Sequence, residues 1–174
     1  MTAPSCFLVD LDDTLFAELD YVDSGYRAIS SKIAAEVNAS ADDVLFRLRY
    51  EFRKFGRVGA FDRVLSHFNN TKMDVSTLVA AYRDHRPDIQ FYPGARDALI
   101  KLRALAPIAI VTDGTAAMQG RKIEALQLQS LVDTIVYCWE CQAPKPATLA
   151  YEIAAKQLGC EIKSAIVIGD DPLH

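Results

Sequence analysis

The sequence predicts an α/β fold, in which a doubly wound, Rossmann-like parallel sheet carries an inserted α-helical region. Four short apolar runs rich in β-branched residues are typical of strands, and helical patterns separate the last three of them. Residues 17–90 show helical patterns without a strand signal. The runs do not alternate polar and apolar positions, which suits strands buried on both faces of a parallel sheet. These runs cover residues 6–10, 108–113, 133–138 and 164–170.

The inserted region opens with two helical patterns. In the first, apolar residues recur every three or four positions, which places them on one helix face, and they are Val22, Tyr26, Ile29, Ile33 and Val37. A second helix is predicted to begin at Ser40, which together with Asp43 resembles a capping box, and to end at Gly56. The first part of the insertion is therefore predicted to be helical.

Two shorter helices and a linker are predicted to complete the insertion. Apolar residues within 61–68 suggest a third helix, and Asp74 is expected to cap a fourth. The segment 86–94, RPDIQFYPG, carries the proline, glycine and turn residues of a return linker. A helix that begins near Ala95 should belong again to the sheet layer.

The domain organisation follows from these patterns. At 174 residues, the chain fits one domain, or one domain that carries a small insertion. We expect residues 1–16 and 91–174 to form the α/β core and residues 17–90 to form the helical insertion. Within the core, one helix is predicted to begin after Gly114 and another at Pro146, because proline is favoured in the first helical turn.

Composition and charge argue against several classes of function. Lys and Arg number 19 against 23 Asp and Glu, for a net charge of -4 with no long basic run, which argues against a nucleic-acid partner. No apolar stretch approaches the roughly 20 residues that span a bilayer, and the N-terminus lacks a secretory pattern, so we expect a cytoplasmic protein. Cys138 and Cys141 lack the second Cys or His pair of a structural zinc site, so they are predicted to be buried thiols.

Polar residues of complementary kinds stand at or near the ends of the four predicted strands. Because ligands bind beyond the carboxyl ends of the strands in an open parallel sheet, these residues should converge on one site. The first motif places three carboxylates within four positions, and they repel each other unless a cation or a substrate group compensates them. The four motifs are Asp10-Leu11-Asp12-Asp13-Thr14, Thr112-Asp113-Gly114, Lys145-Pro146 and Gly169-Asp170-Asp171.

These four motifs, in this order, resemble those of the haloacid dehalogenase superfamily of phosphohydrolases. The pattern covers the chain from Cys6 to its end, and the insertion is similar to the helical cap of that family. The resemblance implies that Asp10 attacks phosphorus and that Asp12 acts as general acid and base, roles that suit carboxylates. It also implies an Mg2+ ion held by Asp10, by the backbone carbonyl of Asp12 and by Asp170, since Mg2+ prefers oxygen ligands.

The second and third motifs are expected to bind the phosphoryl group. Thr112 and the following backbone at Asp113 and Gly114 lead into a predicted helix, and helix N-termini bind anions. Lys145 is predicted at the start of its own helix, where the helix dipole disfavours a cation. This local cost indicates a role for Lys145, which we expect to pair with Asp10 and with the phosphate.

Two further acids in these motifs are expected to have smaller roles. Asp13 is interpreted as a turn residue, because Asp favours turns and helix starts. Asp171 is expected to support the metal site without binding the ion itself. The family normally continues past the fourth strand with a further helix and strand, whereas this sequence ends at His174. We therefore expect the C-terminal end of the core to be missing, which would leave the fourth strand with an exposed edge.

The sequence thus predicts a Mg2+-dependent phosphomonoester hydrolase that acts on a small phosphorylated metabolite, such as a sugar phosphate or a nucleotide, through an aspartyl-phosphate intermediate. A helical lid suits small substrates because it excludes bulk water. A phosphomutase could use the same residues. The sequence does not indicate the oligomeric state. A dehalogenase does not need a second carboxylate, so Asp12 argues against it. A phospho-accepting receiver domain needs an Asp at the end of the third strand, where this chain has Tyr137 and Cys138.

Overall fold

The computed structural model describes residues 4–69 and 72–170. The chain divides into two compact units. The sheet unit combines the residues up to Glu18 with those from Asp88 onward, and the helical unit is Leu19–Pro87. The division into core and cap at residues 17 and 90 stays a prediction, because compactness alone does not show that the units have separate roles.

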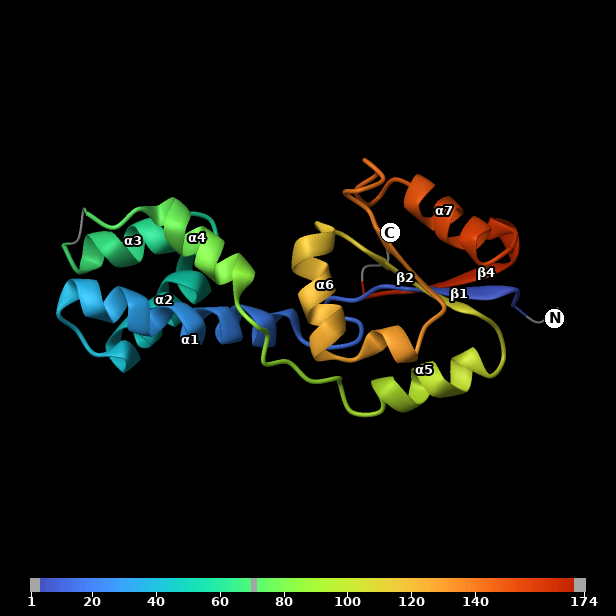
Figure 1. Cartoon of the computed structure of the whole chain (residues 1–174), viewed down its shortest axis with the longest axis horizontal. Helices are drawn as coiled ribbons and strands as arrows, with labels where there is room; N and C mark the ends of the chain where they lie inside the picture. Colours follow the sequence, from blue (N-terminus) through green and yellow to red (C-terminus); the bar gives the residue numbers. More distant parts are fainter. Residues whose placement is uncertain (1–3, 70–71, 171–174) are drawn as a thin grey trace. The chain divides into compact units, whose positions relative to one another are not determined.

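The sheet unit contains a four-stranded parallel sheet with the order β3-β2-β1-β4 (Figure 1). Its strands are β1 (Cys6–Val9), β2 (Ile108–Thr112), β3 (Thr134–Tyr137) and β4 (Ala165–Ile168). Strand β1 lies between β2 and β4, and Leu8 is in register with Ala109 on one side and Val167 on the other. The chain therefore adds β2 and β3 on one side of β1 and β4 on the other. Open α/β sheets bind ligands at such a reversal of strand order. The predicted α/β fold is confirmed.

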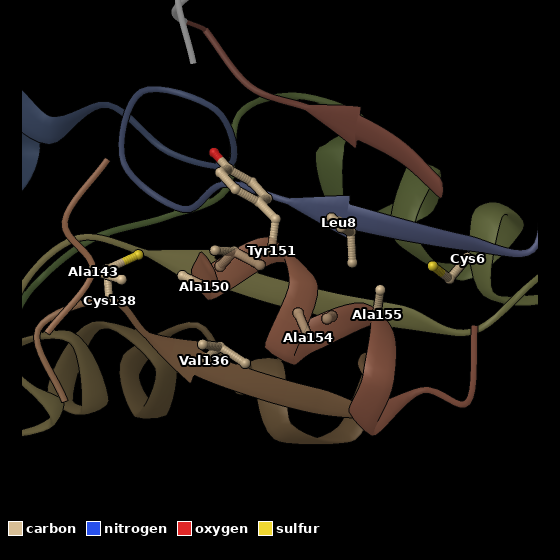
Figure 2. Packing of buried hydrophobic residues seen from close by; sticks show 11 residues of the cluster. Cys6, Leu8, Val136, Cys138, Ala143, Ala150, Tyr151, Ala154 and Ala155 are labelled. Atoms are coloured by element: carbon tan, nitrogen blue, oxygen red, sulfur yellow. The ribbon is translucent and has the colours of Figure 1, made fainter. Parts of the chain in front are cut away.

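Helices cover both faces of this sheet, and Figure 1 shows α7 on one side and α5 on the other. The helices are α5 (Ala95–Arg103), α6 (Ala116–Ala125) and α7 (Leu149–Gln157), with short 3-10 helices at Leu128–Ser130 and Ile162–Ser164. Figure 2 shows α7 packing its alanines against the sheet, where Ala150 and Ala154 lie among Leu8, Val136 and Cys138. Small side chains let the helix approach the strands closely. The Cys138 thiol is buried in this cluster, as the sequence predicted, whereas Cys141 is only partly buried.

Helix α7 begins later than predicted. The sequence placed its start at Pro146, but the amide of Ala147 donates to the carbonyl of Pro144 in a turn, and the helix begins at Leu149. Leu149, the first residue of this helix, is exposed. Lys145 thus precedes the helix by several residues, so the predicted conflict with the helix dipole does not exist. Proline suits a turn as well as the first turn of a helix, and Pro146 lies in a turn here.

The helical unit contains α1 (Glu18–Val37), α2 (Ala41–Phe55), α3 (Ala60–His67) and α4 (Val75–Asp84), with the first residue of α1 belonging to the sheet unit. Ser40 Oγ accepts from the amide of Asp43 at 3.0 Å, and Asp74 Oδ1 accepts from the amide of Ser76 at 3.0 Å, so both predicted N-caps are confirmed. Gly56 ends α2 with a φ of 74°, a conformation that glycine adopts readily. The helices bury four of the five predicted apolar residues of α1, and Val37 is only partly buried. The same cluster contains Val44, Leu48, Val64, Leu65 and Leu78.

Strand β4 lies at the edge of the sheet in the described part of the chain. It pairs with β1, and the side chains of Ile166 and Val167 are exposed. Across the same residues, no helix combines the length and the hydropathy that a membrane crossing needs.

Candidate active site

Asp10 stands directly after β1, between two strands that both end beside it. Its amide donates to the carbonyl of Ile168 at 2.9 Å, which extends the pairing of β1 with β4 by one residue. A Cβ atom built on Gly169 would lie 3.6 Å from the Cβ of Asp10, so the backbone that leads into Asp170 passes beside this side chain. The structure therefore brings the first and fourth motifs together.

Asp10 and Lys145 form an ion pair, in which Lys145 Nζ lies 2.6 Å from Asp10 Oδ1. Burial acts to lower the pKa of Lys145, but the hydrogen bond and the negative charge of Asp10 outweigh it and raise this pKa above its ordinary value. The pKa of Asp10 is raised above its ordinary value, because burial outweighs the opposing hydrogen bond and positive charge of Lys145. The Lys145 ammonium therefore stays charged and partly offsets the effect of burial on Asp10.

Asp12 is held by two side chains from α6. Lys122 Nζ lies 2.7 Å from Asp12 Oδ1, and Gln119 Nε2 donates to Asp12 Oδ2 at 2.7 Å. Each oxygen of this carboxylate therefore has its own donor. Sequence reasoning missed both donors, although a signal was present, because Gln119 and Lys122 share a helix face with the buried Ile123 and Leu126. Two polar residues on an otherwise apolar face indicate a buried polar partner.

Thr112 is the last residue of β2 and is fully buried. Its Oγ1 accepts from Gln119 Nε2 at 2.6 Å, so the same amide group contacts both Thr112 and Asp12. The second motif is thus joined to the first through a residue of α6.

Asp113 connects two loops of the sheet unit through its side chain. Its Oδ1 accepts from the backbone amide of Lys145 at 3.1 Å. Burial raises the pKa of Cys138 to about 12, and the carboxylate of Asp113 adds to this shift. The side chain of Asp113 is exposed, and its contact with the backbone of Lys145 joins the second motif to the third. The φ of Gly114 is +118°, a value that residues other than glycine rarely adopt.

Asp13 makes the turn that the sequence predicted. Its φ is 52°, in the left-handed region that Asp and Asn tolerate better than most residues. Its Oδ1 accepts from the amide of Glu18 at 2.8 Å, at the start of α1. The side chain of Asp13 is therefore used to direct the chain out of the sheet unit.

Comparison with known proteins identifies the family. The family model described as haloacid dehalogenase-like hydrolase matches residues 7–174. The chain belongs to this family. A curated relative, the glyceraldehyde 3-phosphate phosphatase of Methanopyrus kandleri, is 27% identical over 173 residues, which cover 94% of this chain and 74% of that protein. A ribulose-1,5-bisphosphate 5-phosphatase from Halopiger xanaduensis is 29% identical over 85 residues, 48% of this chain and 36% of that protein.

Solved structures of haloacid dehalogenase-like hydrolases share the fold. The putative hydrolase YfnB from Bacillus subtilis, solved with bound magnesium, has a TM-score of 0.65 at 16% identity and covers 98% of this chain and 79% of its own. A putative beta-phosphoglucomutase from Thermotoga maritima has a TM-score of 0.65 at 14% identity, with 94% and 74% covered. At such identities the likeness supports the fold and not the activity.

The oxygen donors of this site are compatible with the Mg2+ ion that phosphatases of the haloacid dehalogenase-like family generally use. In the predicted ligand set, Asp10 and Asp170 would supply carboxylates and Asp12 a backbone carbonyl, all hard donors of the kind this ion prefers. Within residues 4–69 and 72–170, no group of three or more His, Cys, Asp or Glu side chains could hold a metal. The predicted set needs only two such side chains, so Mg2+ stays a prediction. Asp171 lies outside the described residues.

Proposed function

We propose that this protein is a Mg2+-dependent phosphomonoester hydrolase that acts on a small phosphorylated metabolite. The observation that carries the proposal is the pair of carboxylates after β1, since Asp10 and Asp12 each have a lysine ammonium at Oδ1. The two curated relatives support a sugar phosphate as the substrate class, because both are named as phosphatases of phosphorylated three- or five-carbon sugars. A nucleotide remains the second class of substrate.

In the first step, the Asp10 carboxylate attacks phosphorus. The bond from Asp10 to phosphorus forms while the bond from phosphorus to the leaving-group oxygen breaks, which produces an aspartyl phosphate and an alcohol. Asp12 gives its proton to the departing oxygen as general acid. A carboxylate nucleophile divides one difficult displacement into two easier ones.

In the second step, water attacks the aspartyl phosphate. Asp12, now ionised, accepts a proton from this water, and the bond from phosphorus to Asp10 breaks to release inorganic phosphate. Lys145 stays protonated in both steps and compensates charge on Asp10 and on the phosphoryl oxygens. Thr112 and the backbone at Asp113 and Gly114 would hold the phosphoryl group beside the nucleophile.

The metal would be held by Asp10, by the carbonyl of Asp12 and by Asp170. When bound, Mg2+ supplies charge neutralisation at the phosphoryl oxygens. We also propose that the helical region, residues 17–90, acts as a cap that selects small substrates. By excluding bulk water, this cap would protect the aspartyl phosphate until the hydrolytic water is in place.

Two of the three alternative functions leave part of this site without a role. A dehalogenase attacks carbon and leaves no role for Asp12 as proton carrier, although this side chain is held at both oxygens. A receiver domain would need an acidic residue at the end of β3, which ends at Tyr137 instead. A phosphomutase could use every residue named here, and would differ in the acceptor of the phosphoryl group.

The test is hydrolysis of p-nitrophenyl phosphate and of a panel of phosphorylated metabolites. We expect activity that requires Mg2+, that EDTA abolishes and that Asp10→Asn reduces by about 10³-fold or more. Asp13→Asn is the matched control, because it removes a neighbouring charge from a residue that only makes a turn, and it should keep most of the activity. Full activity in Asp10→Asn would overturn the nucleophile assignment. Turnover that depends on a bisphosphate activator would favour the phosphomutase.

A further inference from the structure

Helix α6 carries two polar side chains that packing alone does not explain. Gln119 is 1% exposed and Lys122 is 3% exposed, on the same face as the buried apolar residues Ile123 and Leu126. Apolar residues would fill these two positions without the desolvation penalty that a buried ammonium carries. The mechanism as described above gives neither side chain a task.

Both side chains lead to the carboxylate of Asp12. Lys122 contacts Oδ1 and Gln119 contacts Oδ2, each at 2.7 Å. Donors on both oxygens fix the plane of the carboxylate, whereas a single donor would leave it free to rotate. Each oxygen retains a second lone pair, so the carboxyl group can still carry a proton while it is held.

Gln119 extends this hold to the second motif. Its Nε2 has two hydrogens and donates to Thr112 Oγ1 at 2.6 Å as well as to Asp12. Because the Thr112 oxygen is the acceptor in this contact, its own hydrogen can be donated elsewhere, and a phosphoryl oxygen is a suitable acceptor. A Cβ on Gly114 would lie 3.1 Å from Gln119 Cγ, so this glycine leaves the space in which Gln119 lies.

We propose that Lys122 and Gln119 are positioning residues, which hold the Asp12 carboxyl group so that its proton reaches the leaving-group oxygen. This inference rests on the proposed phosphatase function and assigns the two side chains of α6 to one step of it. Lys145 acts on the nucleophile, and Lys122 acts on the proton carrier. Gln119 in addition sets the direction of the Thr112 hydroxyl.

The test compares kcat/KM for two esters that differ in their need for a proton. For p-nitrophenyl phosphate the leaving anion is stable without a proton, whereas an alkyl phosphate must expel an oxygen that takes one. The alkyl ester is the one hydrolysed fastest in the metabolite panel. Lys122→Met keeps the length of the side chain and removes its donors. We expect kcat/KM to fall by about 10²-fold or more for the alkyl ester and by less than about tenfold for the nitrophenyl ester.

Three controls separate positioning from a structural role. Lys101→Met, at an exposed position of α5, should leave both values unchanged. Asp12→Asn should show the same selectivity between the esters, and adding Lys122→Met to it should lower alkyl-ester hydrolysis little further, because both changes act on one group. An equal loss on both esters in Lys122→Met would show that Lys122 only supports the fold. No loss on either ester would also overturn the proposal.

A second variant keeps the test decisive if Lys122→Met does not fold, as judged by its thermal transition. Gln119→Leu removes the other donor to Asp12 and should show the same selectivity, with a further loss on both esters because Thr112 is released. Equal losses in Gln119→Leu would overturn the inference. If the unaltered enzyme hydrolyses neither ester, the proposed function fails, and this inference fails with it.

Discussion

Each unit of this molecule contains carboxylates held by basic side chains, and the two clusters differ in how far they are open to solvent. In the helical unit, Glu51 is 1% exposed and pairs with Arg47 and Arg63. In the sheet unit, Asp10 and Asp12 pair with buried lysines, but their own side chains remain 19% and 25% exposed. The acids after β1 can therefore meet a ligand, whereas Glu51 cannot.

The partners of the two clusters differ in the same sense. Arg63 also donates to the carbonyls of Val58 at 2.8 Å and Gly56 at 3.2 Å, so the Glu51 cluster fixes the segment between α2 and α3. The sheet-unit cluster instead follows the carboxyl ends of strands, where the topology places ligands. A charged pair inside a protein is thus no sign of function by itself, and its position in the fold and its access to solvent decide the interpretation.

Lys145→Met gives the largest effect expected from either cluster. It removes the ammonium that compensates Asp10, and we expect kcat/KM to fall by about 10³-fold, as for the loss of a group that stabilises charge in a transition state. Lys156→Met, at an exposed position of α7, is the matched control and should change little. Steady-state kinetics checks both. Activity near that of the unaltered enzyme would remove the distinction between the clusters.

Glu51→Gln should instead act on stability. It leaves two arginines without the charge they pair with, and we expect a loss of about 3 kcal/mol in the free energy of unfolding, within the range for a broken buried pair. Glu124→Gln, exposed on α6, should cost less than about 0.5 kcal/mol. Denaturant unfolding followed by circular dichroism measures both values. Equal values would show that Glu51 is not a structural centre.

Ser40→Ala tests an exposed polar contact, in which the Ser40 hydroxyl also donates to the Asp43 carboxylate at 2.6 Å. The hydroxyl of Ser40 accepts from the amide of Asp43 at the start of α2, and its loss should cost about 1 kcal/mol. Ser40→Thr, which keeps the acceptor and the donor of this hydroxyl, should restore most of this loss. Unfolding measurements on the two variants check the order, and a larger loss than in Glu51→Gln would contradict the ranking.

Asp23→Asn should have the smallest effect on stability, and this effect should depend on pH. Two donors of Arg49 hold the pKa of Asp23 below its ordinary value. A lowered pKa contributes stability above the unfolded value of about 4, and the contribution is lost as the pH falls through the folded value. Both side chains are partly exposed, so the contribution is at most about 1 kcal/mol. Between pH 5 and pH 3, Asp23→Asn should therefore lose less stability than the unaltered protein in thermal unfolding.

Local patterns predicted much of the fold. The caps at Ser40 and Asp74 and the turn at Asp13 could be predicted because each depends on residues a few positions apart. The strands could be predicted because an apolar run that is rich in β-branched residues and too short for a helix most often forms a buried strand. The start of α7 was predicted wrongly, since Pro146 suits both a turn and a first helical turn, and only the tertiary structure decides between them.

The candidate site was predictable in part. The motifs at the strand ends identify Asp10, Asp12 and Lys145 as candidates, but nothing near Asp12 in the sequence indicates its donors. Gln119 and Lys122 lie 107 and 110 residues further along the chain and reach it only through the packing of α6. Their position on an apolar helix face was the available signal. A search for apolar residues at helical spacing passes over the polar residues on the same face.

The most direct test of the central claim is the mass of the peptide that contains Asp10 after the enzyme is mixed with substrate and quenched rapidly in acid. We expect this peptide to gain one phosphoryl group, fragmentation to place the group on Asp10, and the Asp10→Asn variant to gain none. Turnover without a phosphorylated peptide, or a phosphoryl group on another residue, would contradict this claim.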